Sequence, residues 1–279
     1  MKTIVIAAGY ATRLGELTKN FPKPLLQIGK STILGRMLDD IDTIPEIEEH
    51  IVVTNHKFAK LFEDWAKERE ISPCASLSRN DNNEKLSRND SENDVISSGA
   101  EGGVEKSHKP IKILDDGTET NETRLGAVCD LLFAMEELNI DDDLLVVAAD
   151  NILDFSFRGF VEYAKAKQTS CIMCHHEPEI YKLQRTGVIE VDEDMRVLQM
   201  QEKPQVPVSH WAVPPFYVYL KKDLDLVRHS VENGCGRDAP GNLAHYMVEH
   251  TVMHAWRMPA GRFDIGSLDT YEEAKRKYK

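Results

Sequence analysis

The stretch IVIAAGYATRLGELTKNFPKPLL, Ile4 to Leu26, decides the fold into which the rest of the chain has to fit. It begins with a short apolar run rich in β-branched residues, which is typical of a strand buried on both faces. The run ends at Gly9, where the missing Cβ lets the backbone turn and approach a ligand. Arg13 and Lys23 follow, the latter between two prolines. A glycine turn after a first strand, with two cations on the loop, favours binding of a polyphosphate.

The chain then alternates between helix and strand patterns. Ser31 can cap a helix whose apolar residues, from Ile33 to Ile41, recur at helical spacing. The apolar run Ile51 to Val53 predicts a strand, and Lys57 to Glu70 predicts a second amphipathic helix. Strand, helix, strand and helix in this order predict a mostly parallel sheet with helices on both sides.

The composition argues against several classes of partner. The formal net charge of −13, from 47 acidic and 34 basic residues, disfavours a nucleic-acid backbone or an anionic membrane as the main partner. No window approaches the roughly 20 apolar residues of a spanning helix, and the N-terminal apolar run is too short for a signal peptide. Five cysteines without a pattern fit a reducing compartment. We therefore expect a cytoplasmic protein with one domain over residues 1–279.

One long segment interrupts the alternation. From Ser72 to Lys109 the sequence is dominated by polar residues, and LSRND occurs twice, at Leu77 to Asp81 and Leu86 to Asp90. Such a segment cannot bury enough apolar surface to offset the entropy of ordering it. It is therefore predicted to be a mobile polar insertion, and its role, as a lid, an oligomer contact or neither, stays open.

The apolar run Leu144 to Ala149 predicts the most deeply buried strand, and it is followed directly by Asp150 and Asn151. Open parallel sheets bind ligands beyond the carboxyl ends of their strands. A carboxylate at that place can hold Mg²⁺ on a triphosphate. A turn or a helix N-cap is the alternative role for Asp150. Just before this strand, Gly126 opens a predicted helix, Leu125 to Leu138, and allows close approach of backbone.

Two patterns imitate metal or haem sites. TSCIMCHHE contains CxxCH, but in a strand Cys171 and Cys174 point to opposite faces, so we interpret them as strand residues. His250 and His254 are four residues apart, as in a helical metal pair, yet VMHAWRM is better interpreted as a strand. Both histidines are therefore expected to be structural.

Several segments together resemble the motifs of the sugar nucleotidylyltransferases of the glucose-1-phosphate thymidylyltransferase type. AAGYATRL and PKPLL resemble G-x-G-T-R-L and P-K-x-L, AADNILDF resembles G-D-N-I, GVIEVDEDMRVLQMQEKP resembles the segment ending in E-K-P, and FDIGSLDT resembles W-x-D-x-G-T. They occur in the family's order and cover nearly the whole chain outside the insertion. Departures are Tyr10 and Ala11 in the loop, and Phe263 and Ser267 in the last motif.

The resemblance implies a three-layer α/β/α fold, the Rossmann-like nucleotide-diphospho-sugar transferase fold, with a mixed and mainly parallel sheet. It implies an enzyme that uses Mg²⁺ to transfer a nucleoside monophosphate from an NTP to a sugar-1-phosphate. The products are an NDP-sugar, as in polysaccharide biosynthesis, and pyrophosphate.

The resemblance also assigns roles to residues. The implied catalytic residues are Arg13, Lys23, Asp150 and Asp264, and the implied metal ligands are Asp150 and Asp264. The implied nucleotide-binding residues are Ala7, Ala8, Gly9, Arg13, Lys23, Gly126 and Asp150. The implied sugar-phosphate-binding residues are Asn151, Gly187, Glu202 and Lys203.

Other functions stay open at this stage. One is cytidylyl transfer to a non-sugar phosphomonoester such as phosphocholine, and another is a catalytically idle subunit that senses nucleotide or sugar phosphate. A metal-dependent glycosyltransferase would favour D-x-D at a strand end, whereas LLVVAA is followed by Asp150 and Asn151. The thymidylyl branch carries a Gln before the helix at Leu125, and DDGTETNETRL has none, so the base is open. The sugar and the oligomeric state, including a homo-oligomer, are open as well.

Overall fold

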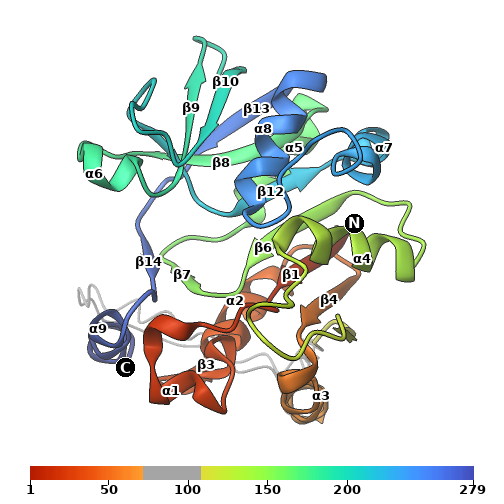
Figure 1. The fold of residues 1–279 in the computed structure, drawn as a ribbon, viewed down its shortest axis with the longest axis vertical. Helices are drawn as coiled ribbons and strands as arrows, with labels where there is room; N and C mark the ends of the chain where they lie inside the picture. The colour runs from red at the N-terminus through yellow and green to blue at the C-terminus, as the bar shows by residue number, and fades with distance from the viewer. Residues whose placement is uncertain (72–107) are drawn as a thin grey trace, which may run out of the picture.

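A mixed sheet forms the centre of the protein (Figure 1). The computed structural model describes residues 1–71 and 108–279, so the predicted insertion, apart from His108 and Lys109, lies outside the described residues. Within these residues the main sheet has ten strands in the order β10-β9-β11-β8-β12-β6-β1-β4-β5, with β13 paired to β8 off this path.

The first half of the sheet is parallel, as the alternation of strands and helices predicted. Its strands are β1 (Lys2–Ile6), β4 (Glu49–Thr54), β5 (Ile111–Asp115) and β6 (Leu144–Ala148). Ile4 of β1 lies between Ile51 of β4 and Val146 of β6, and all three side chains are buried. Their β-branched side chains fill the pleated surface, which is why these short runs form central strands.

The second half is mostly antiparallel. Its strands are β8 (Ser170–His176), β9 (Gly187–Val191), β10 (Val197–Glu202), β11 (Trp211–Val213), β12 (Phe216–Tyr219) and β13 (Met253–Arg257). Among the described strands of the main sheet, only the antiparallel pair β12 and β6 joins this half to the first, with Phe216 opposite Val147.

Helices cover both faces of the sheet, which confirms the three-layer arrangement. One apolar cluster joins Ile4 to α4 (Ala127–Glu137), α7 (Leu224–His229) and α8 (Pro240–His250). The other joins Val5, on the opposite face of β1, to α2 (Ile33–Ile41), α3 (His56–Ile71) and α5 (Arg158–Lys167). Cys171 and Cys174 of β8 are divided between the two clusters, as their strand interpretation requires.

Shorter elements connect these layers. They are η1 (Thr12–Leu14), α1 (Glu16–Lys19), η2 (Lys23–Leu25), β2 (Gln27–Ile28), β3 (Ser31–Thr32), α6 (Ile180–Leu183), η3 (Lys221–Asp223) and α9 (Leu268–Lys277). Ser267 caps α9, as its sequence suggests. The prediction that Ser31 caps α2 is wrong by one position, because the Thr32 hydroxyl accepts the hydrogen bond from the Gly35 amide.

Two three-residue strands that the sequence did not predict bring distant segments together. β7 (Asn151–Leu153) pairs antiparallel with β14 (Arg262–Asp264), so that Asp264 lies opposite Asn151. The amide of Ile265 also donates to the carbonyl oxygen of Asp150 (3.1 Å). The two predicted metal ligands are therefore carried on neighbouring backbone.

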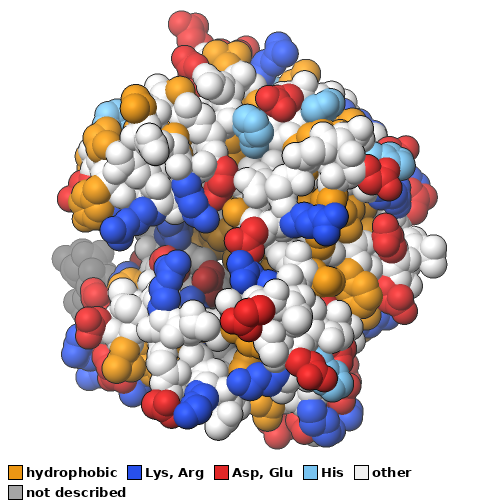
Figure 2. Space-filling view, in the orientation of Figure 1, with side chains coloured by type: hydrophobic (Ala, Val, Ile, Leu, Met, Phe, Trp, Pro, Cys, Tyr) orange, Lys and Arg blue, Asp and Glu red, His pale blue; other side chains and the backbone are white. Residues whose placement is uncertain are grey.

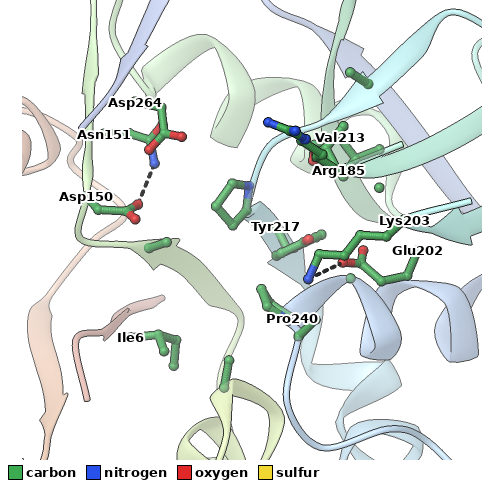
Figure 3. Close-up of a pocket in the computed structure, with 18 of the residues that line it drawn as sticks. Ile6, Asp150, Asn151, Arg185, Glu202, Lys203, Val213, Tyr217, Pro240 and Asp264 are labelled. Carbon is green, nitrogen blue, oxygen red and sulfur yellow. Dashed lines mark hydrogen bonds and ion pairs between the residues drawn. The ribbon is translucent and has the colours of Figure 1, made fainter. Parts of the chain in front are cut away.

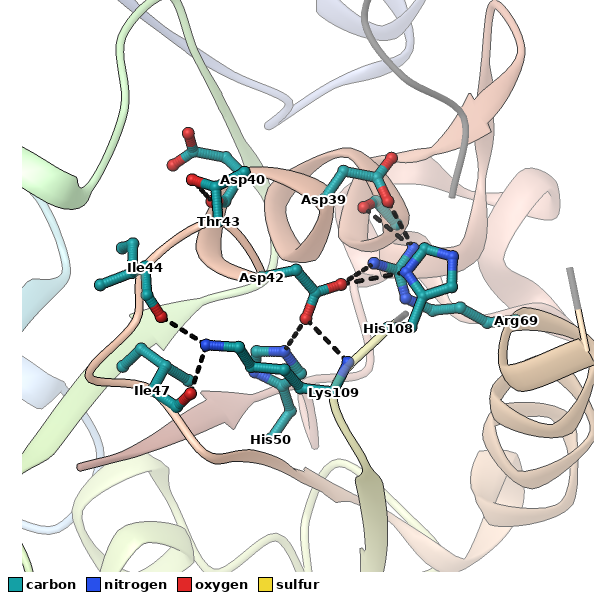
Figure 4. A network of polar contacts seen from close by, with 11 residues as sticks. Asp39, Asp40, Asp42, Thr43, Ile44, Ile47, His50, Arg69, His108 and Lys109 are labelled. Atoms are coloured by element: carbon teal, nitrogen blue, oxygen red, sulfur yellow. Dashed lines mark hydrogen bonds and ion pairs between the residues drawn. The ribbon is translucent and has the colours of Figure 1, made fainter. Parts of the chain in front are cut away.

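A buried polar network lies on the α2 side of the sheet (Figure 4). Asp42, just after α2, accepts hydrogen bonds from Arg69 Nη2 (2.8 Å) and the Lys109 amide (3.2 Å), and it contacts His50 Nε2 (2.8 Å) and His108 Nδ1 (3.0 Å). Arg69 precedes residues 72–107 in the chain, and His108 follows them. One carboxylate thus contacts a residue before and a residue after the chain segment 72–107.

Candidate active site

A cavity of about 560 Å³ opens at the carboxyl ends of β1 and β6. Figure 2 shows a hollow on this face, with Lys, Arg, Asp and Glu side chains around it. The first half of the sheet contributes residues such as Ile6 and Asp150, and the second half contributes others such as Gly187, Glu202 and Lys203. Of the predicted site residues, the cavity brings together Asp150, Asn151, Gly187, Glu202, Lys203 and Asp264.

A chain of hydrogen bonds holds the carboxylate of Asp150 in place. Lys23 Nζ donates to Asp150 Oδ2 (3.0 Å), and Asn151 Nδ2 donates to Asp150 Oδ1 (2.7 Å). Asn151 Oδ1 in turn accepts from Arg262 Nη1 (2.6 Å). Asn151 is 2% exposed, so its amide mainly positions Asp150. Lys23 is nearly buried and the side chain of Asp150 is 39% exposed, so water reaches the pair from the side of Asp150 only.

Asp264 carries the second carboxylate of this group. Partial withdrawal from water raises its pKa, and the negative charge of Asp150 raises it further, whereas the nearby Lys23, Arg262 and Arg13 lower it. Two neighbouring carboxylates that repel each other at the edge of a cavity suit a hard divalent cation. The donor set therefore fits Mg²⁺.

Glu202 and Lys203 form the opposite wall (Figure 3). Their side chains form an ion pair (Lys203 Nζ to Glu202 Oε1, 3.5 Å), and burial raises the pKa of Glu202. Lys203 adopts a left-handed backbone (φ 49°), and its amide donates to the Thr186 carbonyl (3.1 Å). Space for Glu202 depends on Gly241, because a Cβ there would overlap Glu202 Oε2, whereas a Cβ on Gly187 would chiefly crowd Met200 and Val213.

The remaining predicted residues lie beside this cavity and do not line it. Arg13 is exposed on η1, close enough to Asp264 to lower its pKa. Ala7 and Ala8 leave β1, with the Ala8 carbonyl accepting from Asn55 Nδ2 (2.9 Å). A Cβ added to Gly9 would meet no atom of the described chain within 4 Å, and its φ is not positive, so these residues do not require glycine there. Its place in nucleotide binding stays a prediction.

Gly126 precedes α4, and here the protein does require glycine. Its φ is 92°, and a Cβ would lie 2.6 Å from the carbonyl oxygen of Arg237. The amides of Ala127 and Val128 donate to the carbonyls of Asp238 and Arg237 (3.1 and 3.0 Å). Gly126 thus joins the start of α4 to the loop before α8, and its predicted contact with the nucleotide stays a prediction.

Sequence reasoning missed several residues that line the cavity, namely His175, Lys182, Arg185, Tyr217, Asp238, Gly241 and Arg262. One signal was present: counting along W-x-D-x-G-T places Arg262, not Phe263, at the tryptophan position. The others had no local signal, since they reach the cavity only through pairing of the strands.

The described residues contain one group with the spacing of three metal ligands, formed by Asp39, Asp42 and His108. Arg69 forms ion pairs with both of these carboxylates, at 2.8 Å each. Its fixed positive charge occupies the place that a cation would take. We therefore interpret this group as an ion-pair network, and none of its three residues lines the cavity.

Fold and cavity together define a class: an α/β protein in which the carboxyl end of the sheet presents two carboxylates, one of them held by a buried lysine, and a second lysine to one ligand space. The sequence model of the family described as Nucleotidyl transferase matches residues 2–279. The chain belongs to this family, as the motif resemblance predicted.

Curated relatives are distant but cover the chain. It is 22% identical to the bifunctional protein GlmU of Methanocaldococcus jannaschii, over 90% of this chain and 48% of that protein. It is 22% identical to a glucose-1-phosphate adenylyltransferase of Fervidobacterium nodosum, over 97% and 59%. It is 19% identical to the UTP–glucose-1-phosphate uridylyltransferase AglF of Haloferax volcanii, over 99% and 96%. The chain thus spans about half the length of the first two relatives.

Solved structures confirm the fold. A UDP-glucose pyrophosphorylase complexed with UDP-glucose matches with a TM-score of 0.74 at 18% identity, over 99% of this chain and 97% of that one. A glucose-1-phosphate thymidylyltransferase, described as putative, from Bacillus anthracis matches with a TM-score of 0.70 at 17% identity, over 100% and 95%. The nucleotide-diphospho-sugar transferase fold is therefore shown. No helix among residues 1–71 and 108–279 is long and apolar enough to cross a membrane.

Proposed function

We propose that this protein transfers a nucleoside monophosphate from an NTP to a sugar-1-phosphate, with Mg²⁺, and releases pyrophosphate. The observation that carries the proposal is the pairing of two walls in one cavity: Asp150 and Asp264 face Glu202 and Lys203 across it (Figure 3). One wall suits a triphosphate and its metal ion, and the other suits a phosphorylated sugar. The names of the relatives, which are transferases acting on glucose-1-phosphate, agree with this reaction.

The proposed chemistry is one displacement at phosphorus. A phosphate oxygen of the sugar-1-phosphate forms a bond to the α-phosphorus, the bond to the bridging oxygen of pyrophosphate breaks, and its electron pair leaves with the pyrophosphate. The attacking phosphate is already anionic, so no general base is needed. Such reactions depend on positioning and charge neutralisation. When bound by Asp150 and Asp264, Mg²⁺ supplies charge neutralisation at the phosphates.

The protein's own cations divide the remaining work. Lys23, held against Asp150, would stabilise charge at the α-phosphate. Arg13, which is exposed on η1, would bind the departing pyrophosphate. Lys203 orients the attacking phosphate, and the partly buried Glu202 accepts a hydrogen bond from a sugar hydroxyl. Glu202 favours a sugar over phosphocholine, which offers no hydroxyl.

The complete set of charged groups also favours an enzyme over an idle sensor. A protein that only senses ligand has no need of the two carboxylates and the three cations Arg13, Lys23 and Lys203 together. The base stays open, because the relatives' names include adenylyl and uridylyl transfer, and a mannose-1-phosphate guanyltransferase described as putative.

Pyrophosphate release tests the proposal. The protein is incubated with Mg²⁺, each nucleoside triphosphate in turn, and a panel of sugar-1-phosphates plus phosphocholine. Release that depends on both a triphosphate and a sugar-1-phosphate is the expected result. Release with phosphocholine, and with none of the sugar-1-phosphates, would mean that the acceptor substrate is not a sugar phosphate. No release from folded protein with any pair would contradict the enzymatic proposal.

A further inference from the structure

Two cations that line the cavity have no part in the proposed reaction. Arg185 follows α6, and Arg262 begins β14, and both line the cavity. Neither guanidinium forms an ion pair with any of residues 1–71 or 108–279. By contrast, Lys182, which also lines the cavity, is paired with Glu177 (3.9 Å) and with Glu179. The two arginines are therefore cations without an ion-pair partner at a ligand space, and Arg262 in addition lies close enough to Asp264 to lower its pKa.

Arg262 has a fixed direction and an unused donor. Its Nη1 donates to Asn151 Oδ1 (2.6 Å), whereas its Nε is buried and has no hydrogen-bond partner among the described residues. A buried donor without an acceptor is costly, and a charged one more so. A ligand anion in the cavity would lessen this cost by placing negative charge beside the guanidinium.

The surroundings favour an anion over a neutral group. His175 lies close to Arg262: burial lowers the pKa of His175 to about 4, and the charge of Arg262 is the next cause of the shift. His175 is thus neutral at pH 7, and its buried Nδ1 finds no partner in the described part of the chain. Figure 3 shows the Arg185 side chain reaching into the cavity from the wall that also carries Val213. Fixed cations beside a neutral imidazole make a site that is electrostatically complementary to a carboxylate or a phosphate.

We propose that the acceptor substrate carries a second anionic group besides its reacting phosphate, and that Arg185 and Arg262 bind this group. The proposal rests on the proposed function, in which Lys203 already holds the reacting phosphate and Arg13 and Lys23 serve the triphosphate. The acceptor class is then an acidic sugar-1-phosphate, in which a carboxylate or a second phosphate supplies the extra charge.

The same arginine connects this group to the reaction centre. Arg262, Asn151, Asp150 and Lys23 form one chain of hydrogen bonds of 2.6, 2.7 and 3.0 Å. Arg262 orients Asn151, and Asn151 orients the carboxylate of Asp150, which is proposed to hold the metal ion. An anion bound to Arg262 therefore acts on the position of that carboxylate. Arg262 is both a specificity-determining and a positioning residue.

Binding measured without turnover tests the inference separately from the reaction. Calorimetry compares glucose-1-phosphate, glucuronic acid-1-phosphate and glucose-1,6-bisphosphate, each with Mg²⁺ and a non-transferable α,β-methylene analogue of each nucleoside triphosphate in turn. Wild-type protein is expected to bind at least one of the two acidic compounds about 10-fold or more tightly than glucose-1-phosphate, as for a charge-assisted hydrogen bond. Which acidic compound binds identifies the anion as a carboxylate or a phosphate.

Variants locate the effect. Arg185→Gln and Arg262→Gln should each reduce this preference about 10-fold, and Arg276→Gln, which removes an equal charge from exposed α9, should keep it. Equal binding of all three compounds by wild-type protein would overturn the inference. So would an equal loss for neutral and acidic compounds in Arg185→Gln, because Arg185 would then hold the reacting phosphate. If the preference appears without pyrophosphate release from any pair, the proposed reaction fails and the anion site remains.

Discussion

Ala11 adopts a left-handed backbone (φ 46°, ψ 39°) at the loop position where the resembling motif has glycine. This conformation destabilises the folded state by roughly 1–2 kcal/mol for a residue with a Cβ, and a glycine removes that strain. Glycine also makes the unfolded chain more flexible, which lowers the stability of the fold by about 0.4–1 kcal/mol. Ala11→Gly should therefore raise the free energy of unfolding by about 0.5–1 kcal/mol. Urea denaturation measures the change, and a lower midpoint would show that the loop is not strained.

Asp150 and Asp264 are the residues on which the proposed reaction depends most. Asp150→Asn and Asp264→Asn remove charge and keep side-chain volume, so each should lower kcat by about 10²-fold or more. Thermal unfolding of each variant checks that the fold is retained, and Asp194→Asn, in the exposed turn between β9 and β10, serves as the control. Turnover near the wild-type value in both variants would refute the proposed metal site.

The contact between α8 and β10 leaves no room for a side chain at Gly241, because a Cβ there would overlap Glu202 Oε2. Gly241→Ala must displace either the carboxylate or the helix, so it should destabilise the protein by about 1–3 kcal/mol and weaken binding of the sugar phosphate. Gly9→Ala offers a comparison, because the added Cβ would have no described atom within 4 Å and the less flexible unfolded chain should raise the free energy of unfolding by about 0.4–1 kcal/mol. Denaturation and acceptor titration of both variants decide whether Gly241 makes room for Glu202.

Helix α4 contains a buried acid, Asp130, whose Oδ1 has no hydrogen-bond partner within residues 1–71 and 108–279. Burial, and then the charge of Asp116, raise its pKa to about 7, whereas in the unfolded chain it is about 3.9. The unfolded state therefore loses its proton first as pH rises, and this group's contribution to stability falls between pH 4 and pH 7. Asp130→Asn removes the ionisable group, and with it this loss of stability as pH rises.

Measured by urea unfolding, Asp130→Asn should gain stability relative to wild type on going from pH 4 to pH 8, by at most about 4 kcal/mol. A difference between variant and wild type that is the same at both pH values would mean that Asp130 is ionised in the folded protein.

The sequence predicted a helix or strand correctly where the residues of that segment alone carry an apolar pattern. The β-branched runs at Ile4 and Leu144 and the apolar spacing after Ile33 confirm this. Strands β7 and β14 were missed, because three residues carry no periodicity and each forms only through its distant partner. Arg262 and Gly241 were missed for the same reason: their roles depend on what the fold places opposite them.

Across the whole molecule, Asp42 connects segments that are far apart in the chain. It is almost buried and has partners in β4, α3 and the residues just before β5. Asp42→Asn would leave Asp39 as the one carboxylate paired with Arg69 among the described residues, which should cost about 1–3 kcal/mol of unfolding free energy. Asp64→Asn, on exposed α3, breaks only a solvent-screened pair with Lys60 and should cost less than about 1 kcal/mol. Similar losses in both variants, measured by denaturation, would contradict a central role for Asp42.

The seam between β12 and β6 has a consequence for how such proteins diversify. The loop of Arg13 and Lys23, which is proposed to bind the triphosphate, lies on the β6 side of this strand pair, whereas Glu202, Lys203 and Arg185 lie on the β12 side, in one stretch of chain from β8 to β13. Recombination that exchanged this stretch between relatives would have one strand pair of the main sheet to re-form. Acceptor preference could then be inherited as a unit, separately from the machinery that activates the nucleotide.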